Sequence, residues 1–101
     1  MSILHTVNKS PYEKSSVGSC LAHALEGSAI LFYEDAVYAT IKGASIEQLM
    51  TSAKGVKLYA LGADLKARGI SDDKLIDGVE VVDYAGFVDL SADHDKVQAW
   101  V

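Results

Sequence analysis

The chain has 101 residues, half of them hydrophobic, with a net charge of −5 and an isoelectric point near 4.9. This length predicts a single domain over residues 1–101. The acidic balance and the scattered basic residues argue against direct nucleic-acid binding, because phosphate binding depends on clustered Lys and Arg. The longest apolar run, residues 29–33, is far below the roughly 20 residues that span a bilayer. With no secretory pattern at the N-terminus and one cysteine, which excludes an internal disulfide, we expect a soluble cytoplasmic protein.

The first quarter of the chain carries the only cysteine. Residues 2–7 are rich in β-branched and apolar side chains and predict a strand, which ends at the polar, proline-containing residues 8–11. Ser15 or Ser16 can cap the helix that follows, because a serine hydroxyl accepts a hydrogen bond from a free N–H group of the first turn. With Ser16 as the cap, Cys20 lies near the helix start, on an apolar stripe at helical spacing.

The middle of the chain alternates between strand and helix patterns. Residues 28–33 form an unbroken apolar run, which is typical of a strand covered on both faces. Residues 36–42 predict a short helix. Ser45 and Gln48 have the spacing of a capping box and predict a helix through residue 53. Residues 56–61 predict the third strand.

The last third predicts one more strand and two helical segments. Residues 62–69 form a polar, turn-rich segment, and Ser71 can cap a short helical turn that runs through residue 76. Residues 79–83 predict the fourth strand, and residues 84–90 return to helical spacing. The tail, residues 91–101, predicts a last helical turn that docks Trp100 as an aromatic anchor.

Strands that alternate with helices predict an α/β domain with a mostly parallel sheet of four to five strands and helices on both faces. Sites in such sheets gather at the carboxyl ends of the strands. Residues 6–10, 34–35, 62–64 and 83–84 should therefore lie along one edge of the sheet.

Cys20 is the residue with the most obvious covalent chemistry. A thiol near a helix N-terminus can have a lowered pKa, and the thiolate is its nucleophilic form. His23, three positions later, is within reach across one helical turn. Cys20 could then accept or pass a sulfur atom as a persulfide, with His23, Ser16 and Ser19 as supporting residues. The alternative is an inert thiol packed in the core, because free cysteine is among the most buried residue types.

Other polar residues give weaker signals. His5 ends the first strand, where a histidine is more often a satisfied polar group than a site residue. Glu34 and Asp35 could act as an acid pair, but neighbouring carboxylates at a strand end are usually exposed. Residues 93–95 lack the spacing of metal ligands, and the loop after the first strand lacks the glycines of a phosphate-binding loop. We therefore expect no metal and no cofactor.

Several short stretches, in this order and spacing, resemble the DsrH/TusB family of sulfur-relay proteins nearly end to end. They are residues 4–6 (LHT), 10–11 (SP), 34–35 (ED), 37–39 (VYA), 58–61 (LYAL), 64–69 (DLKARG), 82–84 (VDY) with Phe87 and Val88, and 98–100 (QAW). The resemblance implies a three-layer DsrE-like fold. It also implies a small subunit that assembles with two related subunits, DsrE-like and DsrF-like, into a heterohexamer with two copies of each. Sulfur-donor and sulfur-acceptor proteins would be further partners.

The family has two branches, and the resemblance bears on the choice between them. TusB-type proteins take part in relaying sulfur for thiolation of the tRNA wobble uridine, and DsrH-type proteins in dissimilatory sulfur oxidation. DsrH-type subunits carry a cysteine in the first helix that TusB-type subunits generally lack, so Cys20 and the neighbouring residues 8–11 look closer to DsrH.

The leading hypothesis is therefore a subunit of a cytoplasmic sulfurtransferase complex of sulfur oxidation, with persulfide exchange at Cys20. A TusB-like subunit of the tRNA-thiolation relay is one alternative. A non-catalytic scaffold with Cys20 buried is another, since the resemblance assigns the main sulfur-accepting cysteine to the DsrE or TusD partner.

Overall fold

The computed structural model describes residues 2–12, 14–43 and 45–100. Five strands, four α-helices and two 3₁₀ helices follow one another along these residues. In chain order they are β1 (Ile3–Val7), α1 (Ser16–His23), β2 (Ala29–Phe32), the 3₁₀ helix η1 (Glu34–Thr40), α2 (Glu47–Thr51), β3 (Lys57–Leu61), α3 (Gly62–Ala67), the 3₁₀ helix η2 (Asp72–Lys74), β4 (Val79–Val82), α4 (Tyr84–Asp93) and β5 (Lys96–Trp100).

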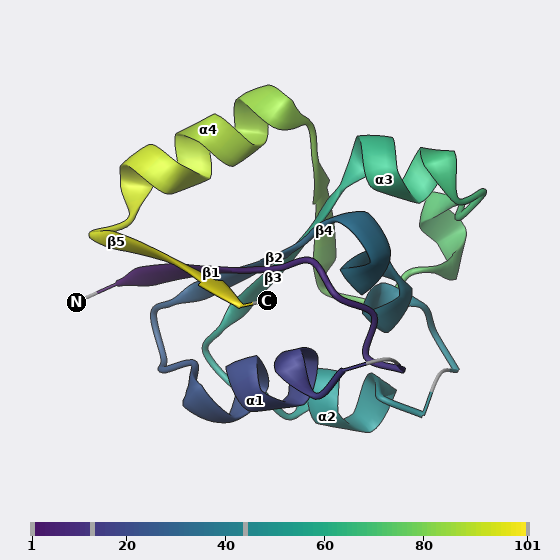
Figure 1. The fold of residues 1–101 in the computed structure, drawn as a ribbon, viewed down its shortest axis with the longest axis horizontal. Helices are drawn as coiled ribbons and strands as arrows, with labels where there is room; N and C mark the ends of the chain where they lie inside the picture. The colour runs from purple at the N-terminus through teal and green to yellow at the C-terminus, as the bar shows by residue number, and fades with distance from the viewer. Residues whose placement is uncertain (1, 13, 44, 101) are drawn as a thin grey trace.

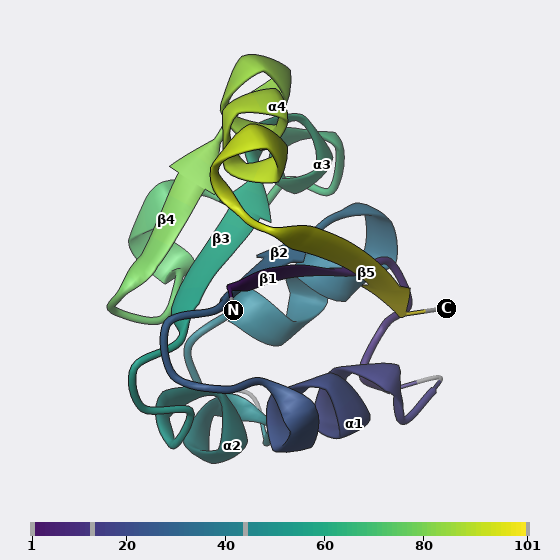
Figure 2. The same cartoon turned by 90° about the vertical axis from the view of Figure 1, so that its left-hand side faces the viewer.

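All five strands form one sheet in the order β4-β3-β2-β1-β5, and each neighbouring pair is parallel. Figures 1 and 2 show α4 on one side of this sheet and α1 and α2 on the other, so the molecule has three layers. The predicted α/β class, the parallel sheet and the helices on both faces are confirmed. Among the described residues, no helix is long and apolar enough to cross a membrane.

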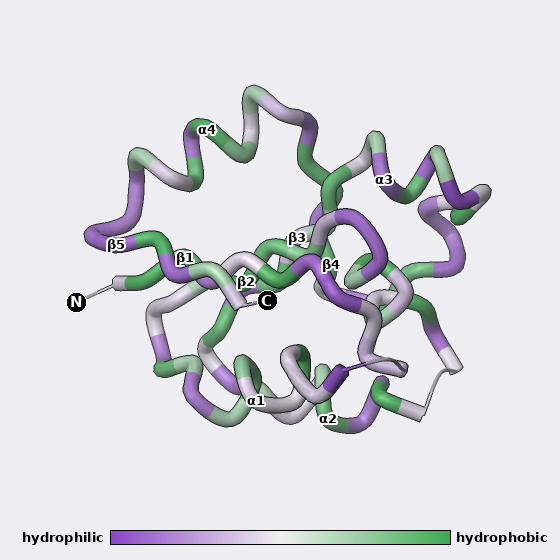
Figure 3. The backbone as a smooth tube through the Cα atoms, in the orientation of Figure 1, coloured by the Kyte–Doolittle hydropathy of each residue, from purple (hydrophilic) through white to green (hydrophobic). Residues whose placement is uncertain are grey.

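The central strand β2 separates the part of the core on one side of the sheet from the part on the other side. All four of its residues are buried, as the unbroken apolar run predicts for a strand covered on both faces. Ile30 and Phe32 belong to the larger cluster, under α1 and α2, whereas Ala29 and Leu31 pack with Leu4 and Tyr59 under α4. Figure 3 shows hydrophobic segments along the strands in the middle of the molecule.

Two segments differ from the sequence prediction. Residues 62–67, predicted to be part of a turn-rich segment, form α3, and Leu65 of this helix is buried with Val37 and Ile70 in a second cluster. Residues 96–100, predicted as a helical turn, form the edge strand β5, which pairs with β1 in parallel register. Both segments are short and mix polar with apolar residues, so contacts with distant parts of the chain decide their conformation rather than local pattern.

The predicted helix starts are only partly confirmed. Ser15 occupies the N-cap position of α1, but its side chain makes no capping hydrogen bond, and Ser16 is the first helical residue rather than the cap. The predicted capping box of residues 45 and 48 is wrong, because α2 begins after Ile46. The carboxylate of Glu47 instead accepts a hydrogen bond of 2.6 Å from the backbone N–H of Gly43.

Helix α4 approaches β4 closely at a glycine. A Cβ atom added at Gly86 would lie 2.9 Å from the Cβ of Val82, which is too short for a real contact. Asp83 caps the same turn, because its Oδ1 accepts a hydrogen bond of 2.7 Å from the Gly86 N–H. Gly86 and Asp83 together fix how the helix leaves the strand.

Candidate functional site

Cys20 lies in the second turn of α1 and points into the core. It is the fifth residue of the helix and is fully buried beside Val7, Val17 and Phe32. With Ser16 as the cap, Cys20 would be the fourth residue of the helix; α1 begins at Ser16 itself, so Cys20 lies one position further from the helix start than predicted. Burial raises the pKa of Cys20 to about 12, since the thiolate loses its hydration inside the apolar cluster. At neutral pH this thiol is protonated, and its role as a persulfide carrier stays a prediction.

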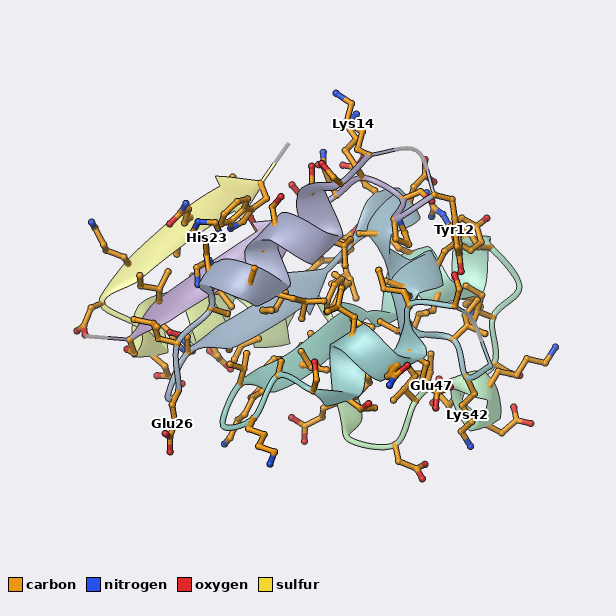
Figure 4. The ribbon with its side chains drawn as sticks, turned by 90° about the horizontal axis from the view of Figure 1, so that it is seen from below. Tyr12, Lys14, His23, Glu26, Lys42 and Glu47 are labelled. Atoms are coloured by element: carbon orange, nitrogen blue, oxygen red, sulfur yellow. The ribbon has the colours of Figure 1, made fainter. Side chains whose placement is uncertain are left out.

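His23, predicted to support Cys20, has other contacts. Its ring is on the exposed side of α1, and its Nδ1 lies 2.8 Å from the backbone oxygen of Ser19. A carbonyl oxygen only accepts, so Nδ1 carries the proton and donates it there. The ring also lies 5.5 Å, centroid to centroid, from the ring of Trp100. Figure 4 shows His23 on the side of α1 that faces β5. Ser19 thus supports His23 through its carbonyl oxygen.

A cluster of three rings joins β1, α1 and β5, and sequence reasoning did not bring its members together. The indole Nε1–H of Trp100 donates a hydrogen bond of 3.0 Å to Nδ1 of His5, so His5 is neutral with its proton on Nε2. His5 is 3% exposed, and burial lowers its pKa, with a smaller contribution from the charge of His23. His5 was predicted to end the first strand, but it is the third of the five residues of β1. The sequence also predicted Trp100 as an aromatic anchor, but it gives no sign that the two residues pair.

The carboxyl edge of the sheet gathers some of the predicted residues. Asp64 Oδ2 accepts a hydrogen bond of 2.7 Å from the backbone N–H of Glu34, which has a left-handed φ of 50°. Arg68 donates to Asp35 Oδ1 from both Nε (3.1 Å) and Nη2 (2.7 Å), and its Nη1 lies 3.7 Å from Asp64 Oδ1. Residues 34–35 and 62–64 are therefore together as predicted, whereas Asp83 serves as a helix cap.

The charges at this edge neutralise one another. The hydrogen bond that Arg68 donates to Asp35 raises the pKa of Arg68, and the negative charges of Asp35 and Asp64 add to this effect. Arg68 therefore remains a cation paired with two carboxylates. This arrangement links η1 to α3 and explains why Glu34 accepts an unfavourable backbone conformation, but it leaves no free acid pair for catalysis.

Two shallow hollows lie at the amino ends of the strands. One, of about 250 Å³, is lined by residues of β3 and β4 together with Gly78. The other, of about 270 Å³, lies between the starts of β2 and β3 and the end of α4, and its lining includes Lys57, Asp93 and His94. Cys20 lines neither hollow. In the described part of the chain, no three His, Cys, Asp or Glu side chains come together as metal ligands would.

The arrangement of helices and strands defines a class of small parallel α/β proteins with known structures. The crystal structure of the Escherichia coli ychN protein matches it with a TM-score of 0.86 at 24% identity, covering 99% of both chains. A protein of unknown function from Methanobacterium thermoautotrophicum matches with a TM-score of 0.75 at 16% identity over 96% of both chains. At these identities the similarity shows the fold alone.

Comparison of the sequence with known families identifies the family of this chain. The family model of DsrH-like proteins matches residues 9–97. Protein TusB of Photorhabdus laumondii is 40% identical over 100 residues, covering 97% of this chain and all of the relative. Protein TusB of Escherichia coli K12 is 32% identical over 98 residues, with the same coverage. The chain belongs to the DsrH/TusB family of sulfur-relay proteins. These relatives favour the TusB alternative over the sulfur-oxidation hypothesis that Cys20 suggested.

Proposed function

We propose that this chain is a TusB-type subunit of a cytoplasmic sulfur relay that supplies sulfur for 2-thiolation of the tRNA wobble uridine. The main support for this proposal is the end-to-end match of the chain to relatives named TusB. The relay would be a complex with two related small subunits, two copies of each, and it would need no metal or organic cofactor in this chain. The net charge of −5 favours protein partners over direct contact with tRNA.

Within that complex the chain has an assembly role, and a partner cysteine carries the transferable sulfur. The burial of Cys20 and its high pKa support this assignment. In persulfide exchange a thiolate attacks the outer sulfur of a donor persulfide, a new S–S bond forms, and the donor leaves as a thiolate. A thiol with a pKa near 12 supplies very little of the attacking species at neutral pH. Sulfur transfer at Cys20 would first require α1 to move away from the sheet.

The experiment is a deletion of the gene in its own host, followed by mass-spectrometric analysis of nucleosides from digested tRNA. We expect the 2-thiouridine derivative of the wobble position to fall sharply and to recover with the wild-type gene. The variants C20A and C20S separate the two roles. If both variants restore tRNA thiolation in the deletion strain, the assembly role is supported. If neither restores it while the complex still assembles, sulfur transfer is assigned to Cys20. Unchanged tRNA thiolation in the deletion strain would refute the proposed function.

A further inference from the structure

The second of the two hollows has the form of a small-molecule site. It lies between the starts of β2 and β3 and the end of α4, and we call it the α4 hollow. Buried residues such as Ala29 and Tyr59 form its floor, whereas Lys57 and Asp93 are exposed and form its rim. Its volume of about 270 Å³ corresponds to roughly nine water molecules at about 30 Å³ each. A ligand of about that many non-hydrogen atoms would fill it, and an apolar floor with a few polar groups is typical of such sites.

Lys57 and Asp93 are two opposite charges on the same rim. Lys57 is the first residue of β3, and Asp93 is the last residue of α4. In the described part of the chain, neither takes part in an ion pair. Lys57 also borders the first hollow, together with Glu80, and it is not paired with that carboxylate. The α4 hollow therefore keeps an ammonium group and a carboxylate apart, and each can contact a bound ligand.

The end of α4 makes the Asp93 side of the rim favourable for a cation. His94 follows the last residue of this ten-residue helix, and its Nδ1 lies 2.7 Å from the backbone oxygen of Leu90. Because a carbonyl oxygen only accepts, Nδ1 carries a proton, and Nε2 of the neutral ring is left as an acceptor. The C-terminal end of a helix also carries partial negative charge. Asp93, His94 and the helix end together favour a group that donates hydrogen bonds and carries positive charge.

The two sides of the rim disfavour ligands with a single charge. A simple anion would be attracted by Lys57 but repelled by Asp93, and a simple cation would meet the reverse. A small molecule that carries both charges satisfies both sides. The apolar floor, formed by Ala29, Leu90 and Tyr59, accommodates a short carbon chain between the two charged groups. Charge and size therefore point to a small zwitterion.

We propose that the α4 hollow is a binding site for a small zwitterion of the α-amino acid class, with its carboxylate at Lys57 and its ammonium group at Asp93 and His94. The ligand ammonium group donates to the Asp93 carboxylate and to Nε2 of His94, and the ligand carboxylate accepts from the Lys57 ammonium group. A ligand of so few atoms gains little binding free energy, so we expect a Kd on the order of 1 mM. The inference rests on the hollow alone and does not depend on the proposed function.

The test is a titration of the isotope-labelled full-length chain with L-alanine at neutral pH, followed by two-dimensional amide NMR. We expect saturable shifts of the backbone amide signals of Gly27, Gly55 and Lys57, which line the hollow. Acetate and ethylamine each carry one of the two charges and serve as matched probes at the same ionic strength. Each of them should bind at least about tenfold more weakly than L-alanine, because each leaves one side of the rim without its partner.

Substitutions test the placement of the two charges. K57Q and D93N should each raise the Kd for L-alanine at least about tenfold, because each removes one charged hydrogen-bonding group. K57R keeps the positive charge and should bind L-alanine more tightly than K57Q. The matched controls are K42Q and D77N, which should leave the Kd unchanged, because Lys42 and Asp77 form an exposed ion pair outside the hollow. The amide spectrum of each variant without ligand checks that it is folded.

Each outcome decides for or against the zwitterion site. Binding of L-alanine that K57Q and D93N weaken, and that K42Q and D77N do not, supports it. Acetate or ethylamine that binds as tightly as L-alanine would make the hollow a site for a single charge and overturn the proposal. So would the absence of saturable shifts at the hollow, or an unchanged Kd in K57Q and D93N. None of these results alters the tRNA thiolation expected in the deletion strain, so failure here leaves the proposed function intact.

Discussion

Trp100 on the last strand donates its indole N–H to Nδ1 of His5 on the first, over a distance of 3.0 Å. The two residues are 95 positions apart in sequence, so this hydrogen bond ties the end of the chain to its beginning. It requires His5 to be neutral at Nδ1, because a protonated nitrogen cannot accept. The stability of the β1–β5 edge therefore depends on the charge of one histidine.

The first prediction concerns pH. The pKa of His5 is lowered from 6.5 in the folded chain, chiefly by burial. The unfolded chain therefore binds a proton at His5 at a higher pH than the folded chain. Stability from neutral His5 is fully present above about pH 6.5 and is lost as the pH falls through the lowered folded-state value. The free energy of unfolding, measured by urea titration, should decrease as the pH falls from about 7 to 5.5.

The variant H5Q provides the comparison, since a glutamine carbonyl can accept from Trp100 but does not titrate. We expect a smaller decrease over this pH range in H5Q, whereas H23Q, at an exposed histidine, should keep most of the wild-type slope. Fluorescence of Trp100, the only tryptophan, reports the same transition. Identical pH profiles for H5Q and wild type would show that His5 is not the titrating group.

The second prediction concerns the reactivity of Cys20. With a pKa of about 12, the thiol should react with iodoacetamide at pH 8 far more slowly in the folded chain than in urea. A lower thiolate fraction alone slows the reaction on the order of 1,000-fold, and burial slows it further. The measurement is the rate of mass gain by the intact protein. Rapid alkylation of the folded chain would mean that α1 opens readily, and would revive sulfur transfer at this position.

The third prediction concerns Arg68, whose side chain is 22% exposed and contacts both Asp35 and Asp64. R68K keeps the charge but cannot donate from two nitrogen atoms to Asp35. We expect it to lower the free energy of unfolding by about 0.5–1 kcal/mol, with partial exposure of the pair limiting the effect. The control is K42A, because Lys42 and Asp77 form an ion pair that is largely exposed. Equal effects of R68K and K42A in urea unfolding would contradict the structural role of Arg68.

The fourth prediction uses two helical glycines in different surroundings. A Cβ at Gly86 would lie 2.9 Å from the Cβ of Val82, whereas a Cβ at Gly18 would meet only Leu49 Cδ2 at 3.9 Å. G86A should therefore destabilise the protein by about 1–3 kcal/mol, because α4 must move away from β4. G18A should stabilise it by about 0.5–1 kcal/mol, because alanine restricts the unfolded chain and favours helix. Thermal unfolding followed by circular dichroism would detect both changes, and a stabilising G86A would refute the close approach of α4.

Local sequence was sufficient for the centre of the fold. The apolar run before Tyr33 determines that β2 lies between two layers, because each of its side chains needs an apolar neighbour on one face or the other. The stripe that contains Val17, Cys20 and Leu21 determines which side of α1 faces the core. The short ordered motifs, 4–6 and 64–69 among them, indicated the family, which the comparisons confirm.

Only the tertiary structure decided the edges and the site. The segment from Lys96 to Trp100 is a strand because β1 offers it a free edge, and nothing in its own composition requires that. The burial of the Cys20 thiol reverses the chemistry that the predicted position near a helix start suggested, because desolvation inside the apolar cluster raises its pKa to about 12. Arg68 meets Asp35 because the strands that precede them, β3 and β2, are neighbours in the sheet. Trp100 meets His5 because β5, the last strand, pairs with β1, the first. Periodicity describes which face a residue occupies, whereas the order of strands in the sheet determines which residues meet.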